Sequence, residues 1–321
     1  MIKWTLGPVT VYGYGLGLAV SAALGLMLMR KETGGKSAAL ALFCIPLSLL
    51  GARLVYCLIR LPWMLEQGVV FFFDLPRGGL SVHGCVLGLA LAGWIIGKKE
   101  KTGAGTVWDQ MAEGCALFLA LARLCAGLSG QGYGLPVRDW FSVDYPSDMS
   151  LIRLRDVSFL ERFPFAVTDY YGDWLFSVFL LEGLMLLLMT VYLHRHRGEK
   201  NRWIRFLAVW LPLQAFGESM RQDAILRFGF VKTGELFCAV GLLLILLVLC
   251  IRQGRGRTIL SVMGLLGCFG LFMAMEFALE GKIRFLRWMT MDLCYLVIAL
   301  SCAGMMILVT RHVPGERRSL K

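Results

Sequence analysis

Residues 78–97 read GGLSVHGCVLGLALAGWIIG, a polar start that leads directly into an apolar run. The apolar part, 80–97, is long enough to cross roughly 30 Å of hydrocarbon as a helix. A histidine, His83, stands where that helix would begin. Because an ionisable side chain at the rim of a bilayer is costly unless it has partners, we expect His83 to have a function.

The composition of the whole chain is that of an integral membrane protein. Hydrophobic residues make up 57% of it and charged residues only 17%, which is outside the range of soluble globular proteins. Nine apolar runs predict transmembrane helices, at 11–29, 38–59, 80–97, 107–128, 174–193, 203–217, 236–251, 258–275 and 289–310. The expected fold class is all-α, a polytopic membrane helix bundle of about nine helices.

Basic residues predict how the helices are oriented, since Lys and Arg near helix ends stay on the cytoplasmic side. They gather in five short segments, at 30–36, 98–101, 195–205, 252–257 and 311–321. With nine helices, all five segments fall on one side of the membrane. We therefore expect the N-terminus outside and the C-terminus in the cytoplasm. The first run should stay in the mature protein, because it lacks a cleavage site.

The net charge and the cysteines are explained by the membrane as well. The net charge of +11 lies largely in short loops that would face an anionic inner leaflet, so it does not indicate nucleic-acid binding. The ten cysteines fall within the predicted helices or at their edges, as small apolar packing residues do. Their spacing is not that of a metal site, and we expect neither a metal nor a cofactor.

We expect the chain to have two parts. Residues 1–257 would form a body of seven membrane helices, which includes a cap at 129–173 on the outer side. The cap is rich in acids and aromatics but too short for a large core of its own. Residues 258–321 would add two further transmembrane helices and a basic cytoplasmic tail.

The predicted topology brings charged side chains together at the outer ends of the helices. His83 begins the third helix, Arg53 lies near the outer end of the second, and Arg123 lies in the outer part of the fourth. Glu218 and Arg221 stand between the sixth and the seventh. Arginines suit a phosphate, because a guanidinium offers several donors and keeps its charge. A phospholipid headgroup is the obvious phosphate at that level.

Motifs follow one another along the chain in a particular order. The first are Gly7-Pro8-Val9 with Tyr12-Gly13-Tyr14-Gly15-Leu16, then Gly51-Ala52-Arg53-Leu54-Val55-Tyr56, then Gly78-Gly79-Leu80-Ser81-Val82-His83-Gly84. Later come Arg123 with Gly130 and Gly134, Leu181-Glu182-Gly183, Glu218 with Arg221-Gln222-Asp223-Ala224, and Thr233-Gly234-Glu235-Leu236. In order and spacing the chain resembles the prolipoprotein diacylglyceryl transferase family over roughly residues 5–250.

The resemblance implies an enzyme of lipoprotein biosynthesis that moves a diacylglyceryl group from phosphatidylglycerol to the cysteine thiol of a prolipoprotein. It implies catalytic roles for His83, Arg123 and Glu218, in which the arginine stabilises the departing phosphate and a histidine or carboxylate takes the thiol proton. It implies lipid-binding positions at Tyr14, Arg53, Gly79, Ser81, Gly84, Gln131, Gly134 and Arg221. The site would face the extracytoplasmic side of a bacterial-type inner membrane, with the anionic phospholipid and a lipobox peptide as partners.

The chain also departs from the family pattern. Ala126 and Ser129 stand where the family has asparagine, Gln131 where it has glutamate, and Gln214 where it has a second arginine. Residues 170–176 do not match the family segment before the fifth helix. Two other functions therefore stay open: a diverged paralogue that uses another lipid or acceptor, and a non-catalytic membrane protein that binds lipid or assembles partners.

Each charged candidate also has a purely structural interpretation. His83 would hydrogen-bond to a loop carbonyl, and Arg123 would pair with Glu182 or Glu218. Glu218 and Arg221 would belong to a solvated turn. A small-solute transporter is disfavoured, because most charges lie at the membrane rims and not at mid-membrane.

Overall fold

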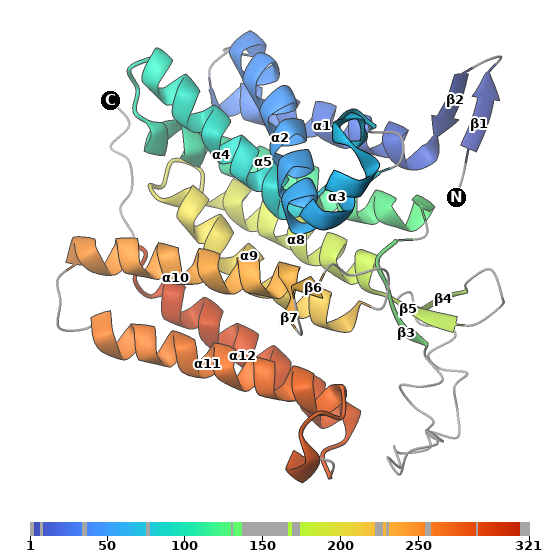
Figure 1. Ribbon diagram of the computed structural model, residues 1–321. Helices are drawn as coiled ribbons and strands as arrows, with labels where there is room; N and C mark the ends of the chain where they lie inside the picture. Colours follow the sequence, from blue (N-terminus) through green and yellow to red (C-terminus); the bar gives the residue numbers. More distant parts are fainter. Residues whose placement is uncertain are drawn as a thin grey trace.

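Nine long α-helices make up most of the part of the chain that the structure describes (Figure 1). The computed structural model describes residues 3–6, 9–33, 37–74, 78–129, 131–136, 166–168, 174–221, 227–228, 231–253, 258–286 and 288–314. Within these residues the long helices are α1 (Gly13–Glu32), α2 (Ser37–Ile59), α4 (Val82–Lys99), α5 (Ala104–Ala126), α8 (Val178–Arg195), α9 (Arg202–Met220), α10 (Thr233–Gln253), α11 (Thr258–Leu279) and α12 (Met291–Thr310). Each falls on one of the nine predicted runs, so the helix bundle is confirmed.

Six of the described helices are long and apolar enough to cross a membrane by length and composition alone: α1, α2, α8, α10, α11 and α12. The more polar helices include α5, which carries Asp109, Glu113 and Arg123, and α9, which carries Arg202 and Glu218. α5 packs against α1, α4, α8 and α9. Neighbouring helices thus shield charges that lipid would not tolerate. The protein is a multi-pass helical membrane protein.

Short elements at the helix ends were not expected from the sequence. The helix α3 (Leu61–Gln67) and the 3-10 helix η1 (Val69–Phe73) follow α2. Two-stranded antiparallel sheets are formed by β1 (Lys3–Leu6) with β2 (Val9–Tyr12), and by β6 (Arg227–Phe228) with β7 (Val231–Lys232). A three-stranded sheet has the order β3 (Tyr133–Pro136), β5 (Trp174–Ser177), β4 (Ala166–Thr168). The predicted cap at 129–173 contributes β3 and β4, and most of it lies outside the described residues.

Glycines let α2 and α4 pack backbone against backbone. A Cβ atom on Gly84 would lie 2.2 Å from the carbonyl oxygen of Gly51, and one on Gly88 would lie 2.0 Å from that of Leu47. Both distances are too short for any side chain, so only glycine permits this approach. The packing fixes the start of α4, and with it His83, against α2.

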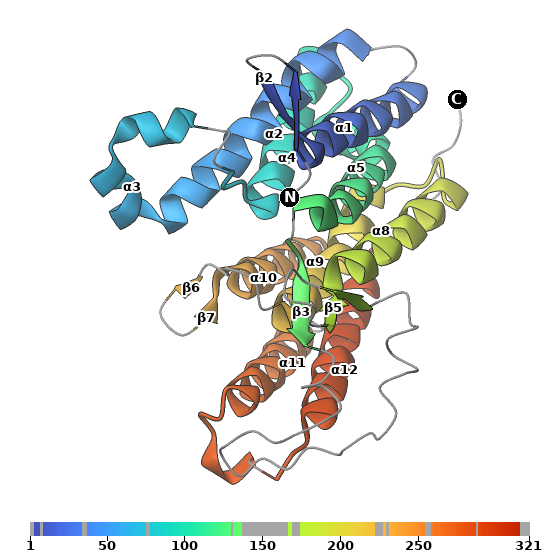
Figure 2. The same cartoon turned by 90° about the vertical axis from the view of Figure 1, so that its right-hand side faces the viewer.

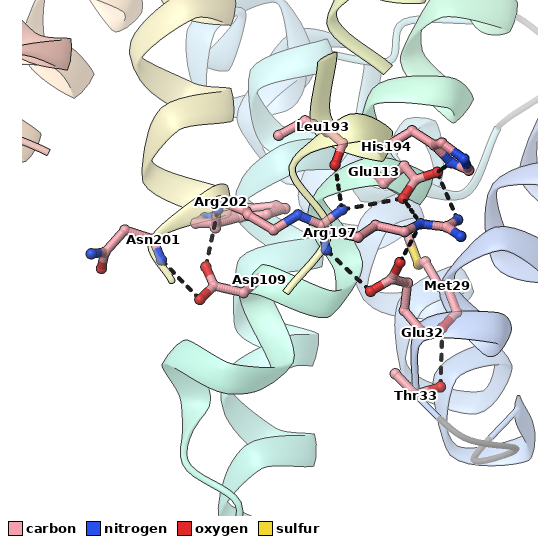
Figure 3. Close-up of polar contacts among 11 residues, drawn as sticks. Met29, Glu32, Thr33, Asp109, Glu113, Leu193, His194, Arg197, Asn201 and Arg202 are labelled. Carbon is pink, nitrogen blue, oxygen red and sulfur yellow. Dashed lines mark hydrogen bonds and ion pairs between the residues drawn. The ribbon is translucent and has the colours of Figure 1, made fainter. Parts of the chain in front are cut away.

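A network of ion pairs ties four helices together at the end of the bundle where the basic segments lie (Figure 3). Glu113 of α5 is 1% exposed and accepts hydrogen bonds from Arg197, at 2.9 Å to each carboxylate oxygen, and from Arg202 at 3.1 Å. His194 Nδ1 lies 2.8 Å from Glu113 Oε1. Glu32 at the end of α1 pairs with Arg197 at 2.7 Å and with Arg202 at 3.1 Å. The network links α1, α5, α8 and α9 at this end of the bundle.

The start of α9 is held from outside its own helix. Asp109 of α5 accepts hydrogen bonds from the backbone N–H of Asn201 at 3.0 Å and of Trp203 at 3.1 Å (Figure 3). The first N–H groups of a helix lack partners within it, so this carboxylate acts as a cap supplied by another helix. β1 and the end of α12 lie at opposite ends of the bundle (Figure 1).

Candidate functional site

A cavity of about 1000 Å³ extends along the bundle beside α1, from Tyr14 near the start of that helix to Met29 near its end. α1, α2, α4, α5, α9 and α10 supply its walls. Its polar lining includes Tyr14, Ser48, Tyr56, Arg60, Ser81, His83, Arg123, Gln131, Glu218, Arg221 and Thr233. Most of the site residues predicted from the sequence therefore meet in one cavity, including all three predicted as catalytic.

The imidazole of His83 is held at the start of α4. The backbone N–H of Ser81 donates to the carbonyl of Ala52 at 3.0 Å, and the Ser81 hydroxyl accepts from the N–H of Gly84 at 3.4 Å, which caps the helix. His83 Nε2 lies 3.4 Å from the Sγ atom of Cys238, and the ring stacks on Phe237 with centroids 5.5 Å apart. His83 is 8% exposed, and these two neighbours restrict the orientation of its ring.

Arg123 forms one of the ion pairs considered from the sequence and still offers a donor. Its Nε atom lies 3.1 Å from Glu182 Oε2, and the two side chains are 13% and 6% exposed. Its Nη2 atom is buried and has no hydrogen-bond partner among the described residues. A buried cationic N–H without an acceptor is costly, and the Arg123 side chain also lines the cavity.

Glu218 is buried, so the solvated-turn interpretation is wrong for this residue. It is 8% exposed. Its Oε1 atom accepts from Gln214 Nε2 at 3.1 Å and from Arg221 Nη1 at 3.4 Å. The backbone of Arg221 pairs with Gly134 in an antiparallel bridge. Gly134 thus connects the described part of the cap to the end of α9.

Arg53 makes a different set of contacts from the other candidates. Its guanidinium donates to the carbonyl oxygens of Phe71, Phe72, Asp74, Gly78 and Gly79. The side chain is 1% exposed. Arg53 therefore fastens η1 and the Gly78-Gly79 turn to α2, while Arg60 of the same region reaches the cavity. A lipid-binding role for Arg53 stays a prediction, as does one for Gly84, whose contact with α2 is structural.

Site residues on different helices lie close enough to interact through their charges. The charges that act on the His83 imidazole are those of Glu218 and Arg123. The charges that act on the Tyr14 hydroxyl include Arg123 and Arg221. Among the described residues, His, Cys, Asp and Glu side chains do not gather in groups of three or more that could hold a metal ion.

Two residues near the site had no site role assigned to them from the sequence. Cys238 contacts His83, and Lys232 donates to the backbone carbonyls of Glu218 and Ser219. A signal for Cys238 was present: it lies one helical turn after Gly234 of the Thr233–Leu236 motif, and residues four apart share a helix face. The ten cysteines are all unpaired, and most are buried as predicted for packing residues.

Comparison with known proteins gives a consistent result. The family model for prolipoprotein diacylglyceryl transferase matches residues 1–251. The phosphatidylglycerol–prolipoprotein diacylglyceryl transferase of Halalkalibacterium halodurans is 23% identical over 259 residues, which cover 78% of this chain and 86% of the relative. The enzyme of the same name from Clostridium kluyveri is 22% identical over 268 residues, which cover 80% of this chain and 98% of the relative. The enzyme from Clostridium botulinum is 24% identical over 254 residues, which cover 76% of this chain and 93% of the relative. α11 and α12 lie beyond the matched residues.

Proposed function

Because the chain belongs to the prolipoprotein diacylglyceryl transferase family, we propose that it transfers the diacylglyceryl group of phosphatidylglycerol to the cysteine thiol of a prolipoprotein. In this reaction a thiolate sulfur forms a bond to a glycerol carbon of the lipid. The bond from that carbon to the phosphate oxygen breaks, and glycerol phosphate leaves with the electron pair. The reaction needs an anion site for the phosphate, a group that takes the thiol proton and an apolar compartment for two acyl chains.

The observation that carries the proposal is Arg123, which lines the cavity and has a buried Nη2 donor without a hydrogen-bond partner among the described residues. The departing phosphate gains negative charge as the carbon–oxygen bond breaks, and a preorganised guanidinium in a dry site stabilises that charge most where it develops. Arg221 and the Tyr14 hydroxyl line the same cavity and add donors to the anion.

The cavity has an apolar branch suited to acyl chains. It follows α1 from Tyr14 to Met29, a length of about 22 Å at the helical rise of about 1.5 Å per residue. That length exceeds half of the roughly 30 Å hydrocarbon core of a bilayer. Apolar side chains of α1, α2 and α5 line it: Leu18, Ala19, Ala22, Leu26, Met29, Ile45, Leu49, Phe118 and Leu119. One compartment therefore suits both the headgroup and the chains of a phospholipid.

We assign the thiol proton to His83. Its imidazole lines the cavity together with Glu218 and Arg123, and a neutral imidazole accepts a proton. A bound phosphate offsets the positive charge of Arg123 and so favours that proton transfer. The acceptor thiol then becomes a thiolate only after the lipid has bound.

Arg221 compensates for the arginine that the family has at position 214. Gln214 donates to Glu218 Oε1 at 3.1 Å, and Arg221 donates to the same oxygen at 3.4 Å. Glu218 thus keeps a cationic partner, about two helical turns away from the family position. Ala126 and Gln131, by contrast, line the cavity without the family side chains. These two positions support the second candidate, a paralogue with a different lipid headgroup or acceptor.

We propose that the end of the bundle that carries His83 faces the extracytoplasmic side of a bacterial cytoplasmic membrane. The ion-pair network at the other end contains Arg197 and Arg202, which belong to one of the basic segments that the positive-inside rule keeps in the cytoplasm. All nine long helices would then cross the membrane. Glycerol phosphate would be released outside the cell.

A direct test is to incubate the purified protein, in nanodiscs, with phosphatidylglycerol and a lipobox peptide. The expected result is a mass gain of one diacylglyceryl group on the peptide cysteine, with an equimolar amount of glycerol phosphate. A peptide with serine in place of cysteine is the control for thiol dependence. Phosphatidylglycerol that stays bound without product would refute the proposed reaction and favour a non-catalytic lipid-binding protein. Product from another headgroup alone would favour the paralogue.

A further inference from the structure

The helix pair α11 and α12 lies beyond the family match but packs on the helices that carry the site. Figures 1 and 2 show the pair on the side of α9 and α10 that faces away from α1 and α2. α12 contacts α9, and α11 contacts α10. Phe272 of α11 and Ile298 of α12 are completely buried. The pair is therefore an integral part of the bundle.

One carboxylate of this pair, Glu276 of α11, reaches toward the site. Glu276 is 5% exposed, and its Oε2 atom lies 3.2 Å from the Nζ atom of Lys232. Lys232 ends β7, directly before α10, and is 6% exposed. Removing both charges from water is costly, and an ion pair buried in this way persists only with good geometry and further hydrogen bonds.

Lys232 supplies those hydrogen bonds to the backbone of the proposed catalytic glutamate. Its Nζ atom donates to the carbonyl oxygen of Glu218 at 3.1 Å and to that of Ser219 at 3.0 Å. An ammonium group has three hydrogens, and Glu276 and these two carbonyls provide three acceptors. The carbonyls belong to the last turn of α9, where a helix has no internal donor for them and where a cation is stabilising.

The contacts form a continuous chain from α11 to the cavity. Glu276 forms an ion pair with the Lys232 ammonium, which donates a hydrogen bond to the backbone carbonyl of Glu218. The position of that backbone determines where the Glu218 carboxylate lies beside Gln214 and Arg221. Glu235 lies 3.6 Å from the same ammonium, beyond hydrogen-bonding distance. Without the charge of Glu276, the ammonium is drawn toward Glu235, and its bonds to α9 weaken.

We propose that Glu276 is a positioning residue for Glu218, and that α11 completes the active site through Lys232. This inference rests on the proposed transferase function for its kinetic consequence. Its structural consequence, an ordered last turn of α9, does not depend on turnover. The two consequences can be measured separately.

The test compares Glu276→Gln with Glu276→Asp, which keeps the charge, and with Glu280→Gln as the matched control. Glu280 follows α11 by one residue and pairs with the half-exposed Lys282, away from Lys232. Hydrogen–deuterium exchange of the amides from 214 to 221 is measured for each protein in nanodiscs, together with kcat and KM for diacylglyceryl transfer. Exchange of a peptide in α4 reports on global unfolding.

We expect Glu276→Gln to raise exchange at 214–221 by about threefold or more while the α4 peptide is unchanged. We also expect kcat to fall about tenfold with KM for phosphatidylglycerol unchanged, and Glu276→Asp to recover part of both effects. Unchanged exchange at 214–221 would overturn the inference whether or not the protein turns over. Faster exchange with an unaltered kcat would also overturn it. A wild-type protein without product would count against the proposed function only, since the exchange result still decides the role of Glu276.

Discussion

Replacement of Gly217 by alanine should uncouple Arg123 from its carboxylate partner. A Cβ atom at this position would lie 2.0 Å from Glu182 Oε1 and 2.7 Å from the carboxyl carbon, so the Glu182 side chain must move. Glu182 now lies 3.1 Å from Arg123 Nε. Breaking a buried ion pair costs about 3–5 kcal/mol, and a guanidinium displaced by about 1 Å would slow catalysis about 100-fold.

The control for this change is Gly270→Ala in α11, because a Cβ atom there meets nothing within 4 Å. Thermal unfolding in detergent and the kcat of diacylglyceryl transfer are measured for both variants and for the wild type. We expect Gly217→Ala to be less stable by about 3 kcal/mol and almost inactive, whereas Gly270→Ala should match the wild type. Equal stability and equal kcat of the two variants would refute the reasoning, because the ion pair between Glu182 and Arg123 would then contribute to neither quantity.

Three other changes test separate contacts. Cys238→Ala removes the thiol beside His83 Nε2, and kcat should fall about tenfold with little change in melting temperature. A kcat within twofold of the wild type would contradict this and show that stacking on Phe237 alone orients the imidazole ring. Glu113→Ala removes the more buried of the two carboxylates that Arg197 and Arg202 share and should lower stability by about 3–5 kcal/mol. Thermal unfolding measures this effect, and an unchanged melting temperature would contradict it. Arg53→Met removes the donor that binds the carbonyls of η1 and of the Gly78-Gly79 turn, so limited proteolysis should cleave between 68 and 80 faster than in the wild type. Equal cleavage rates would show that Arg53 does not fasten this segment to α2.

The helices could be predicted from the sequence because each apolar run encodes its own helix. The run at 236–251, for example, lies entirely within α10. Hydropathy also identified α5 and α9 despite their charges, although the structure shows that neighbouring helices make those charges tolerable. The meeting of His83, Arg123 and Glu218 in one cavity followed from placing helix ends at a common depth.

Contacts between residues far apart in the chain could not be predicted in the same way. Glu113 binds Arg197 across 84 positions, and nothing in either local sequence specifies the partner. The bridge between Gly134 and Arg221 likewise depends on how the cap meets α9. The phosphate preference of a guanidinium suggested a lipid-binding role for Arg53, but its contacts with five backbone carbonyls depend on the tertiary structure and could not be predicted.

The central claim is that His83 and Arg123 act in one lipid-filled cavity, with the first handling a proton and the second holding the phosphate. It is tested most directly on His83→Gln in nanodiscs, where bound phosphatidylglycerol is measured by native mass spectrometry and product on the lipobox peptide is measured in the same sample. We predict that the variant retains the lipid as the wild type does and forms at least about 100-fold less product. Product formation at the wild-type rate would contradict the claim.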